Sequence, residues 1–122
     1  MMLPLLMASV LVSTPEQAIL DDAHQLGHDL AIGEVCEALQ AASIDFDKLV
    51  ETFNTLVVRA EAANISEDAL EKAAEDAATA LGAEFETRYP AGQEAKARTE
   101  LTAVCTDLIT SRAPLFVAYQ AD

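Results

Sequence analysis

Residues 98–109 read RTELTAVCTDLI and carry one regular pattern of apolar side chains. The pattern recurs at intervals of three and four residues, which is the spacing of one face of an α-helix; its members are Leu101, Val104, Cys105 and Leu108. An apolar helical face of this kind normally turns toward the interior of a protein. We therefore expect Cys105 to lie in a core.

The only other cysteine, Cys36, has nearly the same surroundings. The sequence VCEAL at residues 35–39 shares its valine, cysteine and leucine with VCTDL at residues 104–108, and Ile32 extends the helical spacing. Two core-facing helices would then each present one sulfur. We expect a Cys36–Cys105 disulfide that joins the first and last helices of one bundle.

A helix is predicted to begin at Thr14, where three signals agree. Thr14 is a favoured N-cap residue, Pro15 suits the first helical position, and Gln17 completes a capping box. The apolar positions that follow fall about half a turn of the helical wheel away from those around Cys36, so an unbroken helix would need apolar cover on two sides. We therefore predict a break near Gly33 and a separate N-terminal helix, with the apolar positions Ile19, Ala23, Leu26 and Leu30.

Three further helices are predicted after the first cysteine helix. The first starts near residue 46 and ends at Asn64, the second starts at an N-cap Ser66 and stops at residues 89–92, and the third spans residues 93–112. The predicted fold class is all-α: an up-down-up-down four-helix bundle with an additional N-terminal helix. The predicted core residues are Phe46, Leu49, Val50, Phe53, Leu56, Val57, Leu81, Phe85, Leu101, Val104 and Leu108.

Two short segments allow alternative interpretations. Residues 115–119, LFVAY, are apolar, and we expect them to cap the open end of the bundle; a partner-binding segment is the alternative. Asn64-Ile65-Ser66 fits the N-glycosylation pattern, but the end of one helix and the N-cap of the next explain the same residues.

The composition indicates one small acidic domain. The chain has 122 residues, of which 52% are hydrophobic and only 5% aromatic, which favours closely packed helices over a β-sandwich. Against 21 acidic residues stand 7 basic ones, giving a formal charge of -14, so nucleic acids and anionic lipid surfaces are poor partners. The simplest interpretation is that the acidic residues keep the protein soluble. The more specific interpretation is that they bind cations or a basic partner.

Residues 1–13, MMLPLLMASVLVS, form an uncharged and mostly apolar segment. The segment resembles the apolar region of a secretory signal peptide, although a basic start and a clean cleavage site are missing, and it is too short to span a bilayer. The alternative is an apolar N-terminal helix that packs on the domain formed by residues 14–122. Together with the expected disulfide, the segment predicts a periplasmic or secreted protein; if it is no signal and the cysteines are free, the protein is cytoplasmic.

Catalytic and cofactor-binding motifs are absent from the sequence. The chain has no Gly-rich phosphate loop, no Gly-x-Ser-x-Gly, no His-Glu-x-x-His and no Cys-x-x-Cys. We therefore expect neither an enzyme nor a cofactor. The favoured hypothesis is an exported protein that acts through an unidentified protein partner, in the manner of a chaperone or an inhibitor. In outline the chain is similar to small periplasmic helical proteins, acid-stress chaperones among them, a likeness of architecture that assigns no role to any residue.

The alternative hypothesis is a metal-binding helical protein. Asp21, His24 and His28 are spaced by three and four residues, so one helical face would present two imidazoles and a carboxylate. Three such ligands with an open position suit zinc or copper. Against this hypothesis, exposed acidic and histidine side chains are ordinary on a solvated helix, and no fourth ligand is evident.

Overall fold

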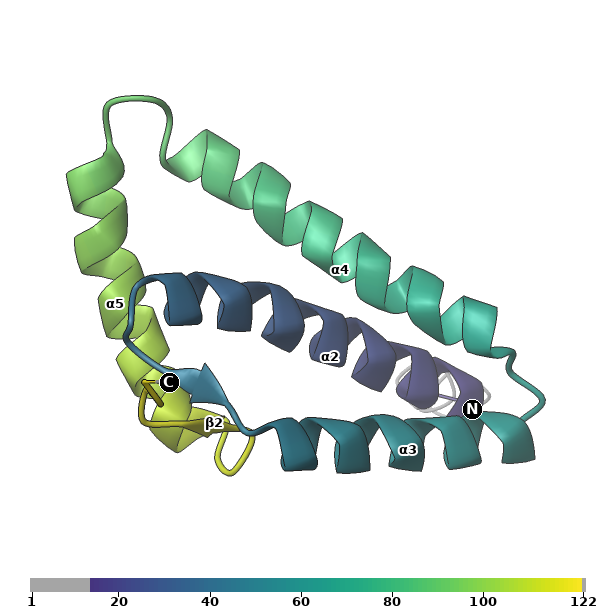
Figure 1. Ribbon diagram of the computed structural model, residues 1–122. Helices are drawn as coiled ribbons and strands as arrows, with labels where there is room; N and C mark the ends of the chain where they lie inside the picture. Colours follow the sequence, from purple (N-terminus) through teal and green to yellow (C-terminus); the bar gives the residue numbers. More distant parts are fainter. Residues whose placement is uncertain (1–13, 122) are drawn as a thin grey trace, which may run out of the picture.

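The structure, a computed structural model, describes residues 14–121 and shows an all-helical protein with one small two-stranded sheet (Figure 1). Its elements in chain order are α2 (Pro15–Ala38), β1 (Ser43–Ile44), α3 (Phe46–Ala62), α4 (Glu67–Arg88), α5 (Glu94–Ser111) and β2 (Phe116–Val117). Residues 1–13, which we compare with a signal peptide, lie outside the described part of the chain.

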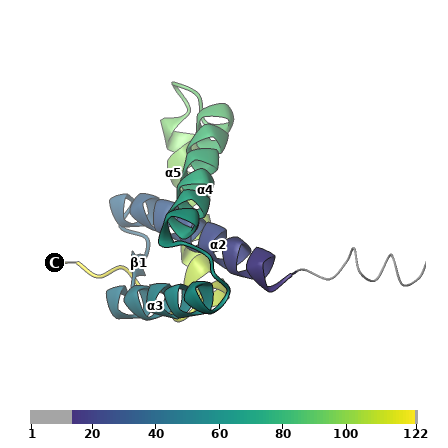
Figure 2. The same ribbon diagram turned by 90° about the vertical axis from the view of Figure 1, so that its right-hand side faces the viewer.

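The longest helix, α2, lies between α4 and α3 (Figures 1 and 2). It begins as predicted, because the Thr14 side chain accepts a hydrogen bond from the Gln17 backbone N–H at 3.0 Å. The predicted break near Gly33 is wrong: α2 continues for 24 residues to Ala38, so the additional N-terminal helix and the first cysteine helix are two halves of one element. Apolar residues on both of its sides are buried, Ile19 and Ile32 among them, whereas Leu30 is exposed.

Close contact between α2 and α4 depends on Gly27. A Cβ atom added there would lie 2.2 Å from the carbonyl oxygen of Ala74, far inside van der Waals contact. Gly33 has a similar role toward β1, because an added Cβ would lie 2.3 Å from the Cδ1 atom of Ile44. The two glycines therefore let neighbouring elements approach α2, and neither interrupts it.

The predicted disulfide is present. Cys36 near the end of α2 and Cys105 in α5 are bonded, with their Cα atoms 5.5 Å apart, and both residues are fully buried. Figure 1 shows α2, α3 and α4 alternating in direction, whereas α5 crosses near the end of α2. Residues 14–121 thus form four helices joined by a disulfide, which confirms the all-α fold class, and the last helix lies across the others.

The C-terminal residues pack back onto the helices, as predicted for a capping segment. Phe116 is 1% exposed, and β2 pairs antiparallel with β1 so that Ile44 lies opposite Phe116. The backbone N–H of Asp45 donates to the Leu115 carbonyl at 2.8 Å, and the Asp45 carboxylate in turn caps α3 by accepting from the Lys48 N–H. This pairing of two-residue strands is invisible to sequence periodicity because the strands are so short.

The predicted core is correct in part. Leu56, Leu81 and Leu101 are buried, and the partly buried residues that pack against the core include Leu49, Val57, Phe85 and Leu108. The prediction is wrong for four residues that are exposed, namely Phe46, Val50, Phe53 and Val104. Three of them lie on α3, which makes this helix the main exception to the expected core.

The orientation of α3 explains the exposed residues. At 100° per residue, Leu49, Leu56 and Ala60 occupy one edge of its apolar stripe, whereas Phe46 and Val50 lie toward the other edge. The first edge packs against the core. α3 and α4 are close only at their connecting turn and diverge away from it (Figures 1 and 2). The second edge is therefore partly buried near that turn, where Val57 packs against the core, and is exposed at Phe46 and Val50. Within residues 14–121, no helix is both long enough and apolar enough to cross a membrane.

Removing the disulfide should destabilise the protein strongly. In the chain-entropy account, a bridge across a sequence separation of 69 stabilises the folded state by about 4 kcal/mol. We expect the Cys36→Ala, Cys105→Ala double variant to lose about that much free energy of unfolding in urea denaturation. Two titratable thiols in unfolded protein from its native compartment would contradict the bridge.

Adding one methyl group at Gly27 should also destabilise the fold. The Gly27→Ala variant forces α2 and α4 apart, and we expect it to lose about 1 to 3 kcal/mol of unfolding free energy or more. Gly82 of α4 is the matched control, because an added Cβ would meet nothing within 4 Å. Gly82→Ala should stabilise the protein by about 0.5 to 1 kcal/mol through helix propensity. Equal effects of the two substitutions in denaturant titrations would show that α2 and α4 do not meet at Gly27.

Candidate functional site

An exposed apolar surface lies along α3 and α2. Phe46, Val50 and Phe53 recur at intervals of four and three residues and so lie on one side of α3. Phe46 is 71% exposed and Phe53 is 38% exposed, and Leu30 of α2 is exposed to a similar degree as Phe53. Large exposed apolar side chains are informative when they are contiguous, because isolated ones are normal on any protein surface.

Two cavities show that Leu30, Phe46 and Phe53 are contiguous, whereas Val50 lines neither cavity. The first, of about 250 Å³, has lining residues from three helices: Ala23, Leu26, Leu30, Phe53, Leu56, Leu70, Glu71, Ala74 and Glu75. The second, of about 170 Å³, is lined by Leu30, Gly33, Glu34, Glu37, Ile44, Phe46 and Leu49. Leu30 lines both, so the two cavities form one surface feature, which we call the apolar groove. Its floor is α2, one wall is α3, and the N-terminal half of α4 forms the other wall beside Phe53.

The rim of the apolar groove is acidic. Glu71 and Glu75 lie one helical turn apart on the α4 wall, and Glu34 and Glu37 lie one turn apart on α2. All four are exposed, and none takes part in an ion pair within the described chain. The residues that line the two cavities include no lysine or arginine. The groove therefore combines apolar walls with uncompensated negative charge at its edges.

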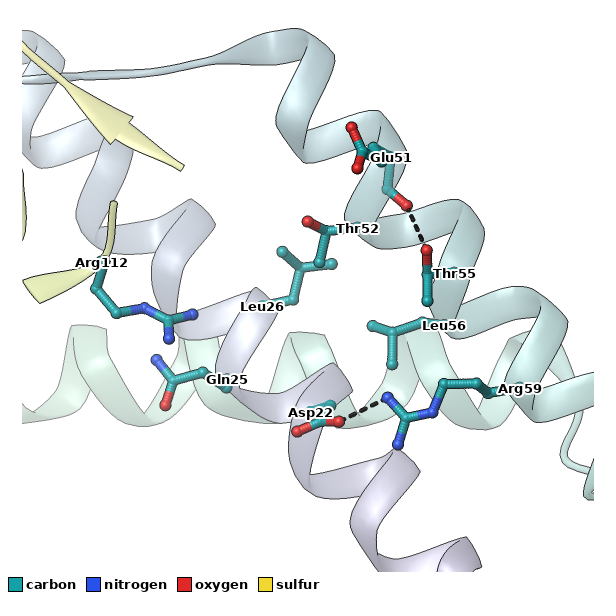
Figure 3. Close-up of a pocket in the computed structure, with 9 residues that line it drawn as sticks. All are labelled: Asp22, Gln25, Leu26, Glu51, Thr52, Thr55, Leu56, Arg59 and Arg112. Carbon is teal, nitrogen blue, oxygen red and sulfur yellow. Dashed lines mark hydrogen bonds and ion pairs between the residues drawn. The ribbon is translucent and has the colours of Figure 1, made fainter. Parts of the chain in front are cut away.

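A polar cavity of about 310 Å³ lies between α2 and α3, beside the end of α5, and shares the buried residues Leu26 and Leu56 with the first cavity of the apolar groove (Figure 3). Its charged groups are already paired: Arg59 Nη1 donates to Asp22 Oδ2 at 2.7 Å, and Glu51 is 3.4 Å from the Lys48 ammonium. The hydroxyl of Thr55 donates to the Glu51 carbonyl at 3.0 Å, as the dashed line in Figure 3 shows. The charged side chains of this cavity are therefore engaged in ion pairs, although the buried Nε atom of Arg112 has no hydrogen-bond partner within residues 14–121.

Asp29 is the one buried charge on the inner side of α2, and the sequence analysis did not identify it. It is 1% exposed; the Arg112 guanidinium forms an ion pair with it, and the Gln25 amide donates to its other oxygen at 3.0 Å. A buried carboxylate needs such partners, because an unpaired buried charge is costly. The pair joins the middle of α2 to the C-cap of α5 and has a structural role. Asp29 is followed by the apolar residues 30–32, and this context in the sequence could have indicated that the carboxylate is buried.

The residues of the metal hypothesis lie on α2, as their spacing predicted. Asp21 and His24 are exposed and His28 is half-buried, and the Gln17 amide donates to Asp21 at 2.8 Å. Among residues 14–121, no group of three or more His, Cys, Asp or Glu side chains is arranged to hold a metal ion. The hypothesis therefore rests on sequence spacing alone and stays a prediction.

Two shifted acid–base groups lie at the turn between α4 and α5, at the far end of α4 from Leu70. The Tyr89 hydroxyl donates to a Glu100 carboxylate oxygen at 2.7 Å, and this hydrogen bond raises the pKa of Tyr89. Hydrogen bonds from the backbone N–H groups of Glu94 itself and of Gly92 lower the pKa of the Glu94 carboxyl. Both interactions order the turn and leave the apolar groove untouched.

The fold and the groove define a small disulfide-joined helical protein with an open apolar surface. No family model matches the chain, and neither a curated protein nor a solved structure matches it at a significant level. The geometry and charge of its own residues are therefore what indicate its function.

The exposure of Phe53 generates a stability prediction. Phe53→Ala should cost about 1 to 2 kcal/mol of unfolding free energy, less than for a fully buried phenylalanine, because more than a third of this residue is already in water. Leu56 is the matched control one turn further along α3; it is buried, and Leu56→Ala should cost about 2 to 5 kcal/mol. Urea denaturation of both variants measures the difference. A cost for Phe53→Ala as large as that for Leu56→Ala would place Phe53 in the core.

Proposed function

We propose that this protein is exported to the periplasm or secreted and acts without catalysis, by binding another protein through the apolar groove. The observation that carries the proposal is the contiguity of Leu30, Phe46 and Phe53 around two joined cavities. Leaving such side chains in water forgoes stabilisation of roughly 25 cal/mol for each Å² of apolar surface that burial would remove. A partner that covers the groove would recover that free energy.

The disulfide supports the exported location. Buried disulfides persist in oxidising compartments and are rare in the cytosol of most organisms. The apolar segment at residues 1–13 is consistent with the same destination. The activity that follows is recognition, of the kind that a chaperone, an inhibitor or a subunit performs.

Site-specific photocrosslinking tests the proposal. Benzoylphenylalanine placed at Phe53 should crosslink to one discrete partner in cells of the native host, because the groove holds that partner against the side chain. Val58 is the matched control: it lies on α3 as well and is 66% exposed, but it lines neither cavity of the groove. Mass spectrometry identifies the adduct, and the purified partner should then bind the unmodified protein at least tenfold more tightly than a Phe53→Ser variant. Equal crosslinking at the two positions, or equal affinity of the two proteins, would contradict the proposal.

A further inference from the structure

We infer that the occupant of the apolar groove is an amphipathic α-helix of the partner protein whose apolar face is flanked by lysine or arginine. This inference rests on the proposed function and specifies the chemistry of the partner. It follows from three features of the groove: the helical walls, the length of the row of aromatic and aliphatic side chains, and the acidic rim.

The walls of the groove favour a helical occupant over an extended one. They are helices α2, α3 and α4, whose backbone donors and acceptors are engaged in their own hydrogen bonds away from their ends. The strand β1 is only two residues long and already pairs with β2. A segment buried in this groove must therefore satisfy its own backbone hydrogen bonds, and an α-helix is the structure that does so.

The row of exposed side chains has the dimensions of a helix-in-groove contact. From Phe46 to Phe53 the row covers seven residues of α3, which is about 10 Å at 1.5 Å per residue. A partner helix that presents apolar side chains at positions i, i+3 or i+4, and i+7 has a row of the same length. Leu30 on the floor lies beside both ends of the row, because it lines the cavities that contain Phe46 and Phe53.

The acidic rim selects a basic partner. Glu34 and Glu37 border one cavity, Glu71 and Glu75 border the other, and none of the four has an ion-pair partner in the part of the chain that the structure describes. Basic side chains at the edges of the partner's apolar face would lie against these carboxylates and steer the encounter.

Charge also argues against the two other occupants of the groove. A second copy of this chain carries a formal charge of -14 and would bring two acidic rims together. Residues 1–13 are apolar enough to enter the groove, but they contain no charged side chain that could neutralise the four glutamates. A basic amphipathic helix satisfies both the apolar walls and the rim.

Synthetic peptides test this inference on the full chain. The probe is an 18-residue helical peptide of leucine and lysine with leucines at i, i+3, i+4 and i+7; a second peptide has the same composition in scrambled order, and a third has glutamine in place of lysine. Fluorescence anisotropy measures their dissociation constants. We expect the probe to bind at least tenfold more tightly than either of the other peptides, and its affinity to fall as salt rises, because screening weakens exposed charge pairs.

Protein variants locate the binding site. Phe53→Ser and Phe46→Ser should each weaken probe binding about tenfold, and circular dichroism melts should show that both variants remain folded. Glu71→Gln with Glu75→Gln should weaken it about threefold to tenfold. The control, Glu86→Gln with Asp107→Asn, removes the same charge at exposed positions outside the groove and should change affinity less than twofold.

The outcomes separate this inference from the proposed function. If the glutamine peptide binds in the groove as tightly as the lysine peptide, the basic partner is wrong and the proposed function stands. If binding ignores Phe53 and Phe46 and follows total charge, the peptide binds a diffuse acidic surface and both proposals fail. A gain in peptide affinity in a Leu5→Ser, Leu6→Ser variant would show that residues 1–13 occupy the groove, and self-association that Phe53→Ser abolishes would show that a second copy does. Either result overturns the inference.

Discussion

The arrangement of the helices depends on α2, which has apolar residues on two sides that other elements must bury. Apolar residues on both of its sides are buried, as Ile19 and Ile32 illustrate, although Leu30 is exposed, and one neighbouring helix covers only one side. α4 packs on one side, close enough that Gly27 meets the backbone of Ala74, while α3, α5 and the C-terminal segment meet the rest. The other helices are arranged around this central element. The part of their apolar surface that does not pack against α2 or against one another is exposed.

Two links hold the last helix against the central one. The Cys36–Cys105 bridge ties α5 to the end of α2, and the ion pair between Asp29 and Arg112 ties the C-cap of α5 to the middle of α2. The two links act differently: the bridge limits the unfolded chain, whereas the ion pair compensates a buried charge that would otherwise be costly. Between them they place Phe116 where β2 can pair with β1 and close this end of the protein.

The apolar groove is a consequence of the same arrangement. Because α4 packs along α2, it diverges from α3. The edge of α3 that carries Phe46 and Val50 is therefore exposed to solvent. Part of the negative charge of the chain lies at this groove, since Glu34 and Glu71 are at its rim. An apolar groove with acidic edges is a surface suited to recognition. Because no lysine or arginine of the described residues pairs with the glutamates at its rim, the proposed partner is positively charged.

The sequence by itself determined the features that depend on neighbouring residues. The helix starts at Thr14 and Ser66 follow from N-cap chemistry, and Asn64, which lies just after α3, has the positive φ of 60° that suits the end of a helix. The pairing of the two cysteines was also predictable, because only two exist and each lies on an apolar helical face.

Only the tertiary structure decided whether α2 continues through Gly33, and which edge of the α3 stripe is buried. Helical periodicity shows that a residue such as Phe53 lies on an apolar face, but its burial depends on which distant helix packs there and at what angle. Gly33 has the same ambiguity: in isolation it weakens a helix, whereas beside Ile44 it permits a close contact that the packed structure uses. For this reason the groove could not be predicted from the sequence. Its side chains have the helical spacing of core residues, and only the positions of the neighbouring helices show that they are exposed.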